Sequence, residues 1–307
     1  MFQRRPLLTA LVPMLAAPAL VRAQSAPAWR AQVPEIRYGI VSVENERDAI
    51  ARLQDMAAYL RQTLDSPVRV FRGSDYAGVV EALRSGHAEF AYLGAAAYAL
   101  AARVMGDKIA PFARYIDNEG AEGYFSAVIV KADSPIRAIG DLRGKTAAWV
   151  DPNSTSGFQF PSYFLRKDGM DPTSFFSRTG FAGSHENVVI AVLNGQYDCG
   201  AVSYSNEARN TFQRMEEKGM IPAGSIRVVW RTPLIPNGPF VGRTDLPGGL
   251  REAFATAMMA MPQANPQAFA EMSSNARGLA PARHADYLDV IAVTEENSAL
   301  RRQQRRS

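Results

Sequence analysis

The chain has 307 residues, of which 47% are hydrophobic and 21% are charged, and its formal net charge is +4. This composition is that of an ordinary globular protein, and the length favours two lobes over one core. Removing residues 1–23 removes Arg4, Arg5 and Arg22, which leaves 4 − 3 = +1. The last seven residues hold four arginines, so the remaining body carries 1 − 4 = −3. A body of this charge lacks the basic face that nucleic-acid binding requires, and no nucleic-acid partner is expected.

The N-terminus has the pattern of a secretory signal peptide. Arg4 and Arg5 precede an apolar run at 6–21, and small residues that suit cleavage follow up to Ala23. The run is shorter than the roughly 17–25 residues of a membrane span. We therefore predict a signal peptide over residues 1–23, a linker over 24–34 and a periplasmic location. The paired arginines are compatible with twin-arginine export, and ordinary secretion fits equally well.

Cysteine and histidine usage argues against disulfide and metal chemistry. Cys199 is the only cysteine, so no intrachain disulfide is possible, and the residue is expected to be buried in a strand. His87, His185 and His284 are scattered without metal-ligand spacing. The sequence predicts no metal and no cofactor.

The predicted elements alternate between strands and helices along the chain. The first set comprises strands at 36–41, 68–71 and 90–93 and helices at 45–64, 74–84 and 95–104. The second set comprises strands at 127–130, 146–150, 179–181 and 199–202 and helices at 158–167 and 185–194. Strands at 230–234 and 240–242 and helices at 250–261 and 266–273 complete the chain. This alternation predicts an α/β fold with parallel sheets.

Two segments match without gaps at an offset of 109 residues. Residues 79–86 align with 188–195, and each segment reads as a helix that ends at a glycine before a strand. At the same offset Tyr76 aligns with His185, on the first turn of each helix. Chance similarity between two amphipathic helices would explain the match. We favour a pair of similar lobes that face each other across a cleft, because open α/β sheets bind ligands beyond the carboxyl ends of their strands.

The expected organisation is therefore two lobes joined by a hinge of two chain crossings, near 126–130 and 229–241. Lobe 1 is predicted to be discontinuous and lobe 2 continuous, and the chain is predicted to end in a solvated basic tail. The predicted ranges are 35–128 and 236–292 for lobe 1, 129–235 for lobe 2 and 293–307 for the tail.

The segment Asp151-Pro-Asn-Ser-Thr-Ser-Gly-Phe158 is the most informative motif. Three hydroxyl side chains and a glycine precede a helical run. A helix N-terminus carries unpaired N–H groups and a partial positive charge, and hydroxyls add donors without adding a full charge. The motif predicts an anion site, although an ordinary helix cap would also suit it.

The chain resembles the periplasmic phosphonate-binding proteins of ABC importers, a group that includes phosphite and methylphosphonate binders. The resemblance spans about residues 36–244. The segments that carry it are Ser74-Asp-Tyr-Ala-Gly78, Gly123-Tyr-Phe-Ser126, 151–158, Ala182-Gly-Ser-His-Glu186 and Pro233-Leu-Ile-Pro236. It implies a type II periplasmic-binding-protein fold with two Rossmann-like lobes that close on the ligand.

The resemblance also implies which residues bind the ligand. The phosphonate oxygens would be held by hydroxyls and backbone N–H groups of Ser154, Thr155 and Ser156. Tyr76, Tyr124 and His185 would approach from the first lobe, the hinge and the second lobe. Ser184 and Asp75 are expected at helix starts. Dipoles rather than formal positive charges are expected to neutralise the anion.

The sequence departs from the family pattern where aminoalkylphosphonate binders need carboxylates for the ligand ammonium. Gly238 stands where one aspartate is expected, and Ser205 stands nearest to the expected glutamate, with Glu207 reached only by a shifted alignment. A buried, unpaired ammonium is costly. We therefore expect 2-aminoethylphosphonate to be a poor ligand and favour phosphite or a small phosphonate with an uncharged tail. Tyr204 and Asn237 would shape the remaining space.

The expected partners are a small phosphorus oxyanion and a membrane permease with its ATPase, and the protein is expected to be a monomer. Two other classes remain open. A ligand-presenting sensory protein would have the same pocket. An enzyme on this fold would need a nucleophile with its base or a metal, and the chain has no Gly-x-Ser-x-Gly motif and no cluster of metal-ligand residues.

Overall fold

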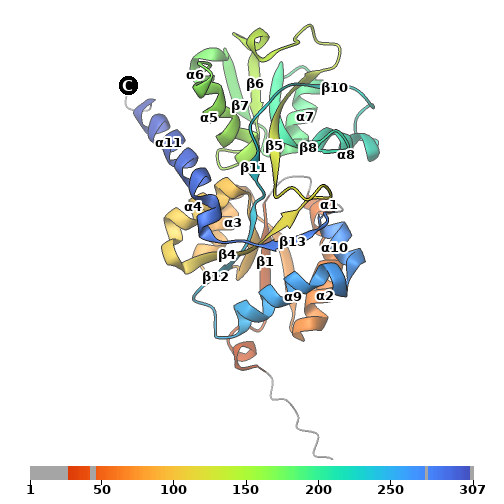
Figure 1. The fold of residues 1–307 in the computed structure, drawn as a ribbon, viewed down its shortest axis with the longest axis vertical. Coiled ribbons are helices and arrows are strands. Elements are labelled where there is room, and N and C mark those ends of the chain that lie inside the picture. The colour runs from red at the N-terminus through yellow and green to blue at the C-terminus, as the bar shows by residue number, and fades with distance from the viewer. Residues whose placement is uncertain (1–26, 42–45, 274–275, 305–307) are drawn as a thin grey trace, which may run out of the picture.

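A computed structural model describes residues 27–41, 46–273 and 276–304. The predicted signal peptide lies outside the described residues. Two α/β lobes are stacked along the long axis of the molecule, one built mainly of the N- and C-terminal thirds and the other of the middle third (Figure 1). The predicted two-lobed α/β architecture is confirmed.

Lobe 1 contains a six-stranded sheet in the order β13-β4-β12-β3-β1-β2. Its strands are β1 (Ile36–Ile40), β2 (Val68–Arg72), β3 (Phe90–Tyr92), β4 (Ile109–Ile116), β12 (Pro239–Arg243) and β13 (Gly278–Pro281). Its helices are η1 (Ala28–Ala31), α1 (Glu46–Ala51), α2 (Gln54–Leu64), α3 (Tyr76–Arg84), α4 (Ala95–Met105), η2 (Gly106–Lys108), α9 (Leu250–Ala264), α10 (Pro266–Ser273) and η5 (His284–Tyr287). β1 pairs in parallel with β2 and β3, and the other neighbours are antiparallel. The ring of Phe254 on α9 stacks on Phe90 at a centroid distance of 3.8 Å, which attaches this helix to the sheet.

Lobe 2 contains a sheet in the order β10-β5-β8-β6-β7. Its strands are β5 (Gly123–Lys131), β6 (Thr146–Trp149), β7 (Arg178–Phe181), β8 (Cys199–Asn206), β9 (Arg209–Asn210), β10 (Ile226–Arg231) and β11 (Ile235–Pro236). Its helices are η3 (Ile139–Leu142), η4 (Thr155–Gln159), α5 (Phe160–Lys167), α6 (Pro172–Phe175), α7 (His185–Leu193) and α8 (Thr211–Glu217). Cys199 is buried at the start of β8, as predicted.

The internal repeat extends to the hydrogen-bonding register of the sheets. Adding 109 to the bounds of α3, 76 and 84, gives 185 and 193, the bounds of α7. The pair Arg37↔Arg69 between β1 and β2 becomes 146↔178, which is the observed pair Thr146↔Arg178 between β6 and β7. The pair Tyr38↔Phe90 becomes 147↔199, which is the observed pair Ala147↔Cys199. The two lobes therefore share one β-α-β-α-β unit.

The first chain crossing comes earlier than predicted. All of β5 belongs to the sheet of lobe 2, so the crossing runs through 117–122 and the predicted boundary at 128/129 is wrong. The reason is that β5 already pairs with β11 at Gly123. The return crossing follows β11, and the backbone N–H of Asn237 donates to the carbonyl of Glu122 at 2.9 Å. The two crossings therefore run side by side.

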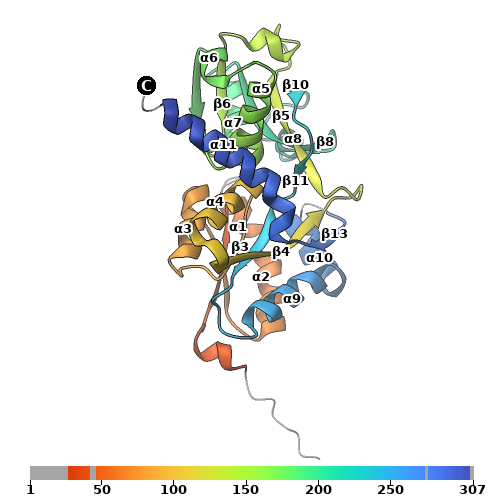
Figure 2. The ribbon, with the colours of Figure 1, turned by 60° about the vertical axis from the view of Figure 1, so that its left-hand side comes forward.

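The predictions of a linker at 24–34 and a solvated tail at 293–307 are partly wrong. The expected linker contains η1, whose Trp29 is buried, and the expected tail 293–307 is helical as far as Gln304 in α11 (Leu288–Gln304). α11 leaves lobe 1 and runs along the side of the molecule, where it packs against α4 of lobe 1 and α5 of lobe 2 (Figures 1 and 2). The helix predicted at 45–64 is likewise two helices, α1 and α2.

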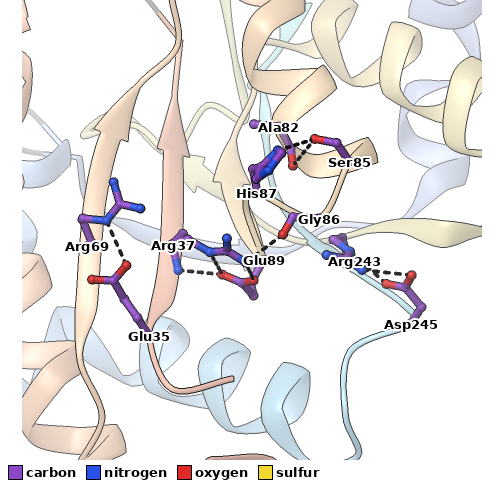
Figure 3. Close-up of polar contacts among 10 residues, drawn as sticks. All are labelled: Glu35, Arg37, Arg69, Ala82, Ser85, Gly86, His87, Glu89, Arg243 and Asp245. Carbon is purple, nitrogen blue, oxygen red and sulfur yellow. Dashed lines mark hydrogen bonds and ion pairs between the residues drawn. The ribbon is translucent and has the colours of Figure 1, made fainter. Parts of the chain in front are cut away.

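A polar cluster closes the end of lobe 1 where its parallel strands begin. The guanidinium of Arg37 forms an ion pair with Glu89, whose side chain is almost fully buried, and also donates to the carbonyl of Gly86 at 2.7 Å (Figure 3). The backbone N–H of Arg37 donates to the same carboxylate at 2.7 Å. Because Glu89 is fully engaged there, this cluster is structural, and it leaves the opposite ends of the strands for a binding site.

Candidate functional site

One cavity of about 220 Å³ lies between the two lobes. All six residues predicted to bind the ligand line it, namely Ser154, Thr155, Ser156, Tyr76, Tyr124 and His185. The two residues expected to shape the pocket, Tyr204 and Asn237, line it as well. The structure therefore gathers residues from both lobes and from the hinge around one space.

The Ser-Thr-Ser segment forms a buried π-helical turn, η4, that continues into α5. Ser154 is its N-cap, and the Ser154 hydroxyl accepts from the backbone N–H of Gly157 at 3.1 Å. A side chain at Gly157 would lie 2.4 Å from the Cβ of Val150, so only glycine lets this turn approach strand β6 closely. π-Helical turns within helices often occur at functional sites. Residues 154–156, which we call the hydroxyl turn, present three hydroxyl groups to the cavity. Each of these residues is less than 3% exposed.

Thr155 connects the two lobes at this point. Its hydroxyl oxygen accepts from the backbone N–H of Ala96, at the start of α4 in lobe 1, at 2.9 Å. A hydroxyl that accepts a hydrogen bond still has its own hydrogen to donate. Gly94, the N-cap of α4, also lines the cavity. The α4 start was not predicted as part of the site, and the only sequence signal was a glycine before an alanine-rich helix.

Tyr76 and Tyr124 supply neutral phenol groups. Burial raises the pKa of Tyr76, with an opposing effect from its hydrogen bond to Ser154. Burial likewise raises the pKa of Tyr124, against hydrogen bonds to Ser156 and Thr155. Both phenols therefore remain protonated at neutral pH and are linked to the hydroxyl turn.

His185 is a neutral imidazole with a defined tautomer. Burial, helped by the positive charge of Arg214, lowers its pKa to about 3. Its Nδ1 atom accepts from the backbone N–H of Ser203 at 3.1 Å, so in the neutral ring the proton is on Nε2. Ser184 caps this helix by accepting from Asn187, as predicted. His185 therefore acts as an uncharged N–H donor.

Two carboxylates, those of Asp75 and Asp151, lie near the hydroxyl turn without lining the cavity. The Asp75 carboxylate caps α3 by accepting from Gly78 at 2.7 Å, as predicted for a helix start. Asp151 accepts from the backbone N–H of Asn153 at 2.6 Å and also from that of Tyr76 across the lobe boundary. Burial, together with the negative charge of Asp75, raises the pKa of Asp151. These carboxylates therefore belong to the lobe contact.

The positions where carboxylates would bind an ammonium group hold other residues. Ser205, Asn237 and Gly238 line the cavity, and Glu207 does not. The hydroxyl of Tyr204 donates to the Glu207 carboxylate. A Cβ at position 238 would lie 2.1 Å from the backbone carbonyl of Leu93, so the backbone there leaves no room for an aspartate.

The expectation of few formal positive charges in the pocket is wrong. Arg52, Arg209 and Arg214 all line the cavity, away from the hydroxyl turn in sequence. The sequence did not reveal these arginines because none of them belongs to a motif. They lie between α1 and α2, on β9 and on α8. In the described part of the chain, no cluster of metal-ligand side chains is found and no helix is long and apolar enough to cross a membrane.

Comparison with known proteins places this geometry in one family. Residues 38–287 match the family described as ABC transporter, phosphonate, periplasmic substrate-binding protein. The phosphate-import protein PhnD of Mycolicibacterium smegmatis is 30% identical over 280 residues, which cover 85% of each chain.

Solved structures agree with that assignment. A binding protein of an ABC phosphonate transporter from Pseudomonas aeruginosa is 27% identical with a TM-score of 0.74, and 85% of each chain is covered. PhnD1 of Prochlorococcus marinus, solved with methylphosphonate, is 19% identical with a TM-score of 0.75, covering 86% of this chain and 98% of that one. The fold is therefore that of the type II periplasmic binding proteins, as the sequence predicted. The chain belongs to the periplasmic substrate-binding proteins of ABC phosphonate transporters.

Proposed function

We propose that this protein captures a small phosphonate, phosphite or related phosphorus oxyanion between its lobes and delivers it to a membrane permease with its ATPase. The observation that carries the proposal is the convergence of uncharged donors on one interlobe cavity. The donors are the hydroxyls of Ser154, Thr155 and Ser156, the phenols of Tyr76 and Tyr124, and the imidazole N–H of His185. The phenols also bond to the hydroxyls, so a tetrahedral oxyanion with three oxygens would take over some of these hydrogen bonds and accept from the histidine as well.

The energetics agree with reversible capture. A hydrogen bond to a charged acceptor contributes about 1.5–3 kcal/mol net. Four or five such bonds supply the roughly 8 kcal/mol of micromolar affinity after the costs of association and closure. Uncharged donors also let the ligand leave once the lobes separate.

The geometry favours transport over the other functional classes. The cavity-lining histidine is held neutral with Nδ1 occupied by a backbone N–H, which leaves it no free lone pair to serve as a base toward a cavity serine. The relatives are transport proteins. We expect a periplasmic monomer, exported through its N-terminal segment. A sensory role would use the same pocket, and a lack of ligand uptake in a gene-deletion strain separates transport from sensing.

The absence of a carboxylate at positions 205 and 238 bears on ligand choice. Serine and glycine line the cavity there. An ammonium group beside these two positions would find no carboxylate there, and an unpaired buried charge is costly. We therefore propose that 2-aminoethylphosphonate binds poorly.

A thermal-shift panel tests the function. Purified protein without residues 1–23 is scanned with phosphite, methylphosphonate, ethylphosphonate, 2-aminoethylphosphonate, phosphate and sulfate. A true ligand at 100 times its dissociation constant adds about 2.7 kcal/mol of stability. We expect a phosphonate or phosphite to give this shift and 2-aminoethylphosphonate to give little.

The matched variants locate the site. Ser154→Ala with Thr155→Ala removes two hydroxyl donors and should abolish the shift while the protein stays folded. Thr173→Ala with Ser174→Ala removes the same two groups from exposed positions of α6 and should leave the shift unchanged. A full shift in the first double variant would move the site elsewhere.

A further inference from the structure

The interlobe cavity is larger than an oxyanion alone requires. Its volume of about 220 Å³ is more than ten times the roughly 15 Å³, on the same measure, that admits one water. The hydroxyl turn lines one part of it. Other parts are lined by residues from β9, α10 and the β1 and β4 strands, including Arg209, Ser273, Tyr38 and Tyr115. The substituent of a bound phosphonate would meet these residues.

Arg209 is the most informative of them. It lies on the short strand β9, whose pairing with β8 fixes its position. One guanidinium nitrogen donates to the carbonyl of Ser273 across the lobe boundary at 2.8 Å. The Nη1 atom is buried and has no hydrogen-bond partner among the described residues. A buried N–H pair of a cation without an acceptor is unfavourable, and since Arg209 lines the cavity, a small shift of the side chain toward a ligand acceptor would relieve this cost.

The surroundings of Arg209 are also rich in donors. Its charge opposes the rise in pKa that burial causes at Tyr92 and Tyr115, and all three residues line the same cavity. Arg52 acts in the same way on Tyr115 and Tyr38. These phenols remain protonated, so this region presents hydroxyl donors and guanidinium groups together.

Carboxylates are scarce among the described residues that line the cavity. The only carboxylate among the cavity-lining residues described is that of Asp117. Its Oδ1 atom already accepts from the backbone N–H groups of Glu119 and Ala121, at 3.0 and 2.7 Å, and so shapes the hinge loop. Among the described lining residues, three arginines therefore stand against one carboxylate.

We propose that the ligand of this protein carries a second anionic group on a short spacer, which Arg209 binds while the phosphonate group binds the hydroxyl turn. This inference rests on the proposed function and narrows it to phosphonates with an anionic tail, such as phosphonocarboxylates. It replaces the uncharged tail expected from the sequence. A planar guanidinium matches a carboxylate through paired N–H donors, which an ammonium tail could not satisfy.

Calorimetric titration in a two-by-two design tests the inference. Wild type and Arg209→Met are each titrated with phosphonoacetate and with isobutylphosphonate, which has the same shape with methyl groups in place of the carboxylate oxygens. Arg209→Met also removes the bond to Ser273, but this loss affects both ligands and cancels in the ratio. 3-Phosphonopropionate tests the effect of a longer spacer. Methylenediphosphonate tests whether a second phosphonate group can replace the carboxylate.

We expect at least one ligand with a second anionic group to bind wild type tenfold or more tightly than isobutylphosphonate. This factor equals about 1.4 kcal/mol. In Arg209→Met this preference should fall below threefold, and Arg209→Lys should keep part of it. The inference would be overturned if every ligand with a second anionic group bound wild type no more tightly than isobutylphosphonate. An unchanged preference in Arg209→Met would overturn it as well. If no phosphonate bound wild type, isobutylphosphonate and methylphosphonate included, the proposed function itself would be overturned.

Discussion

Three of the predicted binding residues are oriented by the fold in the same way. The Ser154 and Thr155 hydroxyls each accept a backbone N–H, from Gly157 and Ala96, which orients the oxygen. The imidazole of His185 is oriented in the same way through Nδ1. A backbone N–H therefore fixes each of these three groups before any ligand arrives.

The buried neutral state of His185 predicts a pH dependence of stability. Its pKa is about 3 in the folded protein and about 6.5 in the unfolded chain. Between these values the unfolded chain binds more protons, so stability falls as pH falls from about 6.5 towards 3, by up to roughly 1.4 kcal/mol per pH unit. Above pH 7 the group has no effect.

Denaturant unfolding at pH 7, 6, 5 and 4, without ligand, checks this expectation. The matched variant is His185→Gln, in which a side-chain amide that does not titrate replaces the imidazole ring. Wild type should lose more stability than the variant on acidification. Parallel curves for the two proteins would show that His185 is not held neutral by burial.

The sequence predicted the motif residues of the site and missed those without a motif. Residues 154–156 were found because hydroxyls before a helix have a local chemical meaning. Arg209 and Ala96 reach the cavity only through β9 pairing and the contact between lobes, which are tertiary features. The clash of a side chain at Gly238 with Leu93 is a consequence of the pairing of β12 with β3, which no local pattern reveals.

At the level of elements, the repeat explains the geometry of the site. Because α3 and α7 occupy equivalent places in the two lobes, Tyr76 and His185 both stand at a helix start beyond a parallel sheet. The gapless match in sequence was sufficient to predict this. Strands β4 and β13 were missed because each pairs mainly with residues far along the chain, such as Ile116 with Gly278.

Helix α11 was mistaken for a solvated tail because its end is rich in arginine. Its buried residues Val290, Val293 and Asn297 follow helical spacing, but the stripe is short and includes a polar residue. The arginine also has a structural role, since the Arg301 guanidinium lies 5.3 Å from the centre of the Phe158 ring in lobe 2. Composition alone does not reveal such a contact.

Asn297 is predicted to attach α11 to lobe 2. Its side-chain amide donates to the backbone carbonyl of Gln159 at 2.9 Å and to the side-chain oxygen of Gln159 at 2.6 Å, and Arg166 donates to its oxygen. Asn297→Ala would leave buried partners unsatisfied and should lower the free energy of unfolding by about 1–3 kcal/mol. Gln303→Ala, an amide removed from the exposed end of the helix, should change it by less than about 0.5 kcal/mol.

Chemical denaturation of the two variants measures the difference. Equal stabilities would mean that α11 lies against lobe 2 without being held there by Asn297.

The whole molecule is in a closed arrangement. Lys218 of lobe 2 forms an ion pair with Asp48 of lobe 1 at 2.8 Å, Arg209 bonds Ser273, and Thr155 bonds Ala96. The ion pair is partly exposed and so contributes at most about 1 kcal/mol. Tyr76 also bonds to Ser154 and Asp151 across the lobes, and a ligand that bonds to both lobes would shift the balance between open and closed states further.

The central claim is that a phosphorus oxyanion binds at residues 154–156 between the two lobes. A crystal structure of the protein with methylphosphonate tests it most directly. We predict phosphonate oxygens within hydrogen-bonding distance, about 2.5–3.2 Å, of the Ser154 and Thr155 hydroxyls and of Nε2 of His185. Methylphosphonate bound at another place, or a closed cavity in which side chains fill the space beside residues 154–156, would contradict the claim.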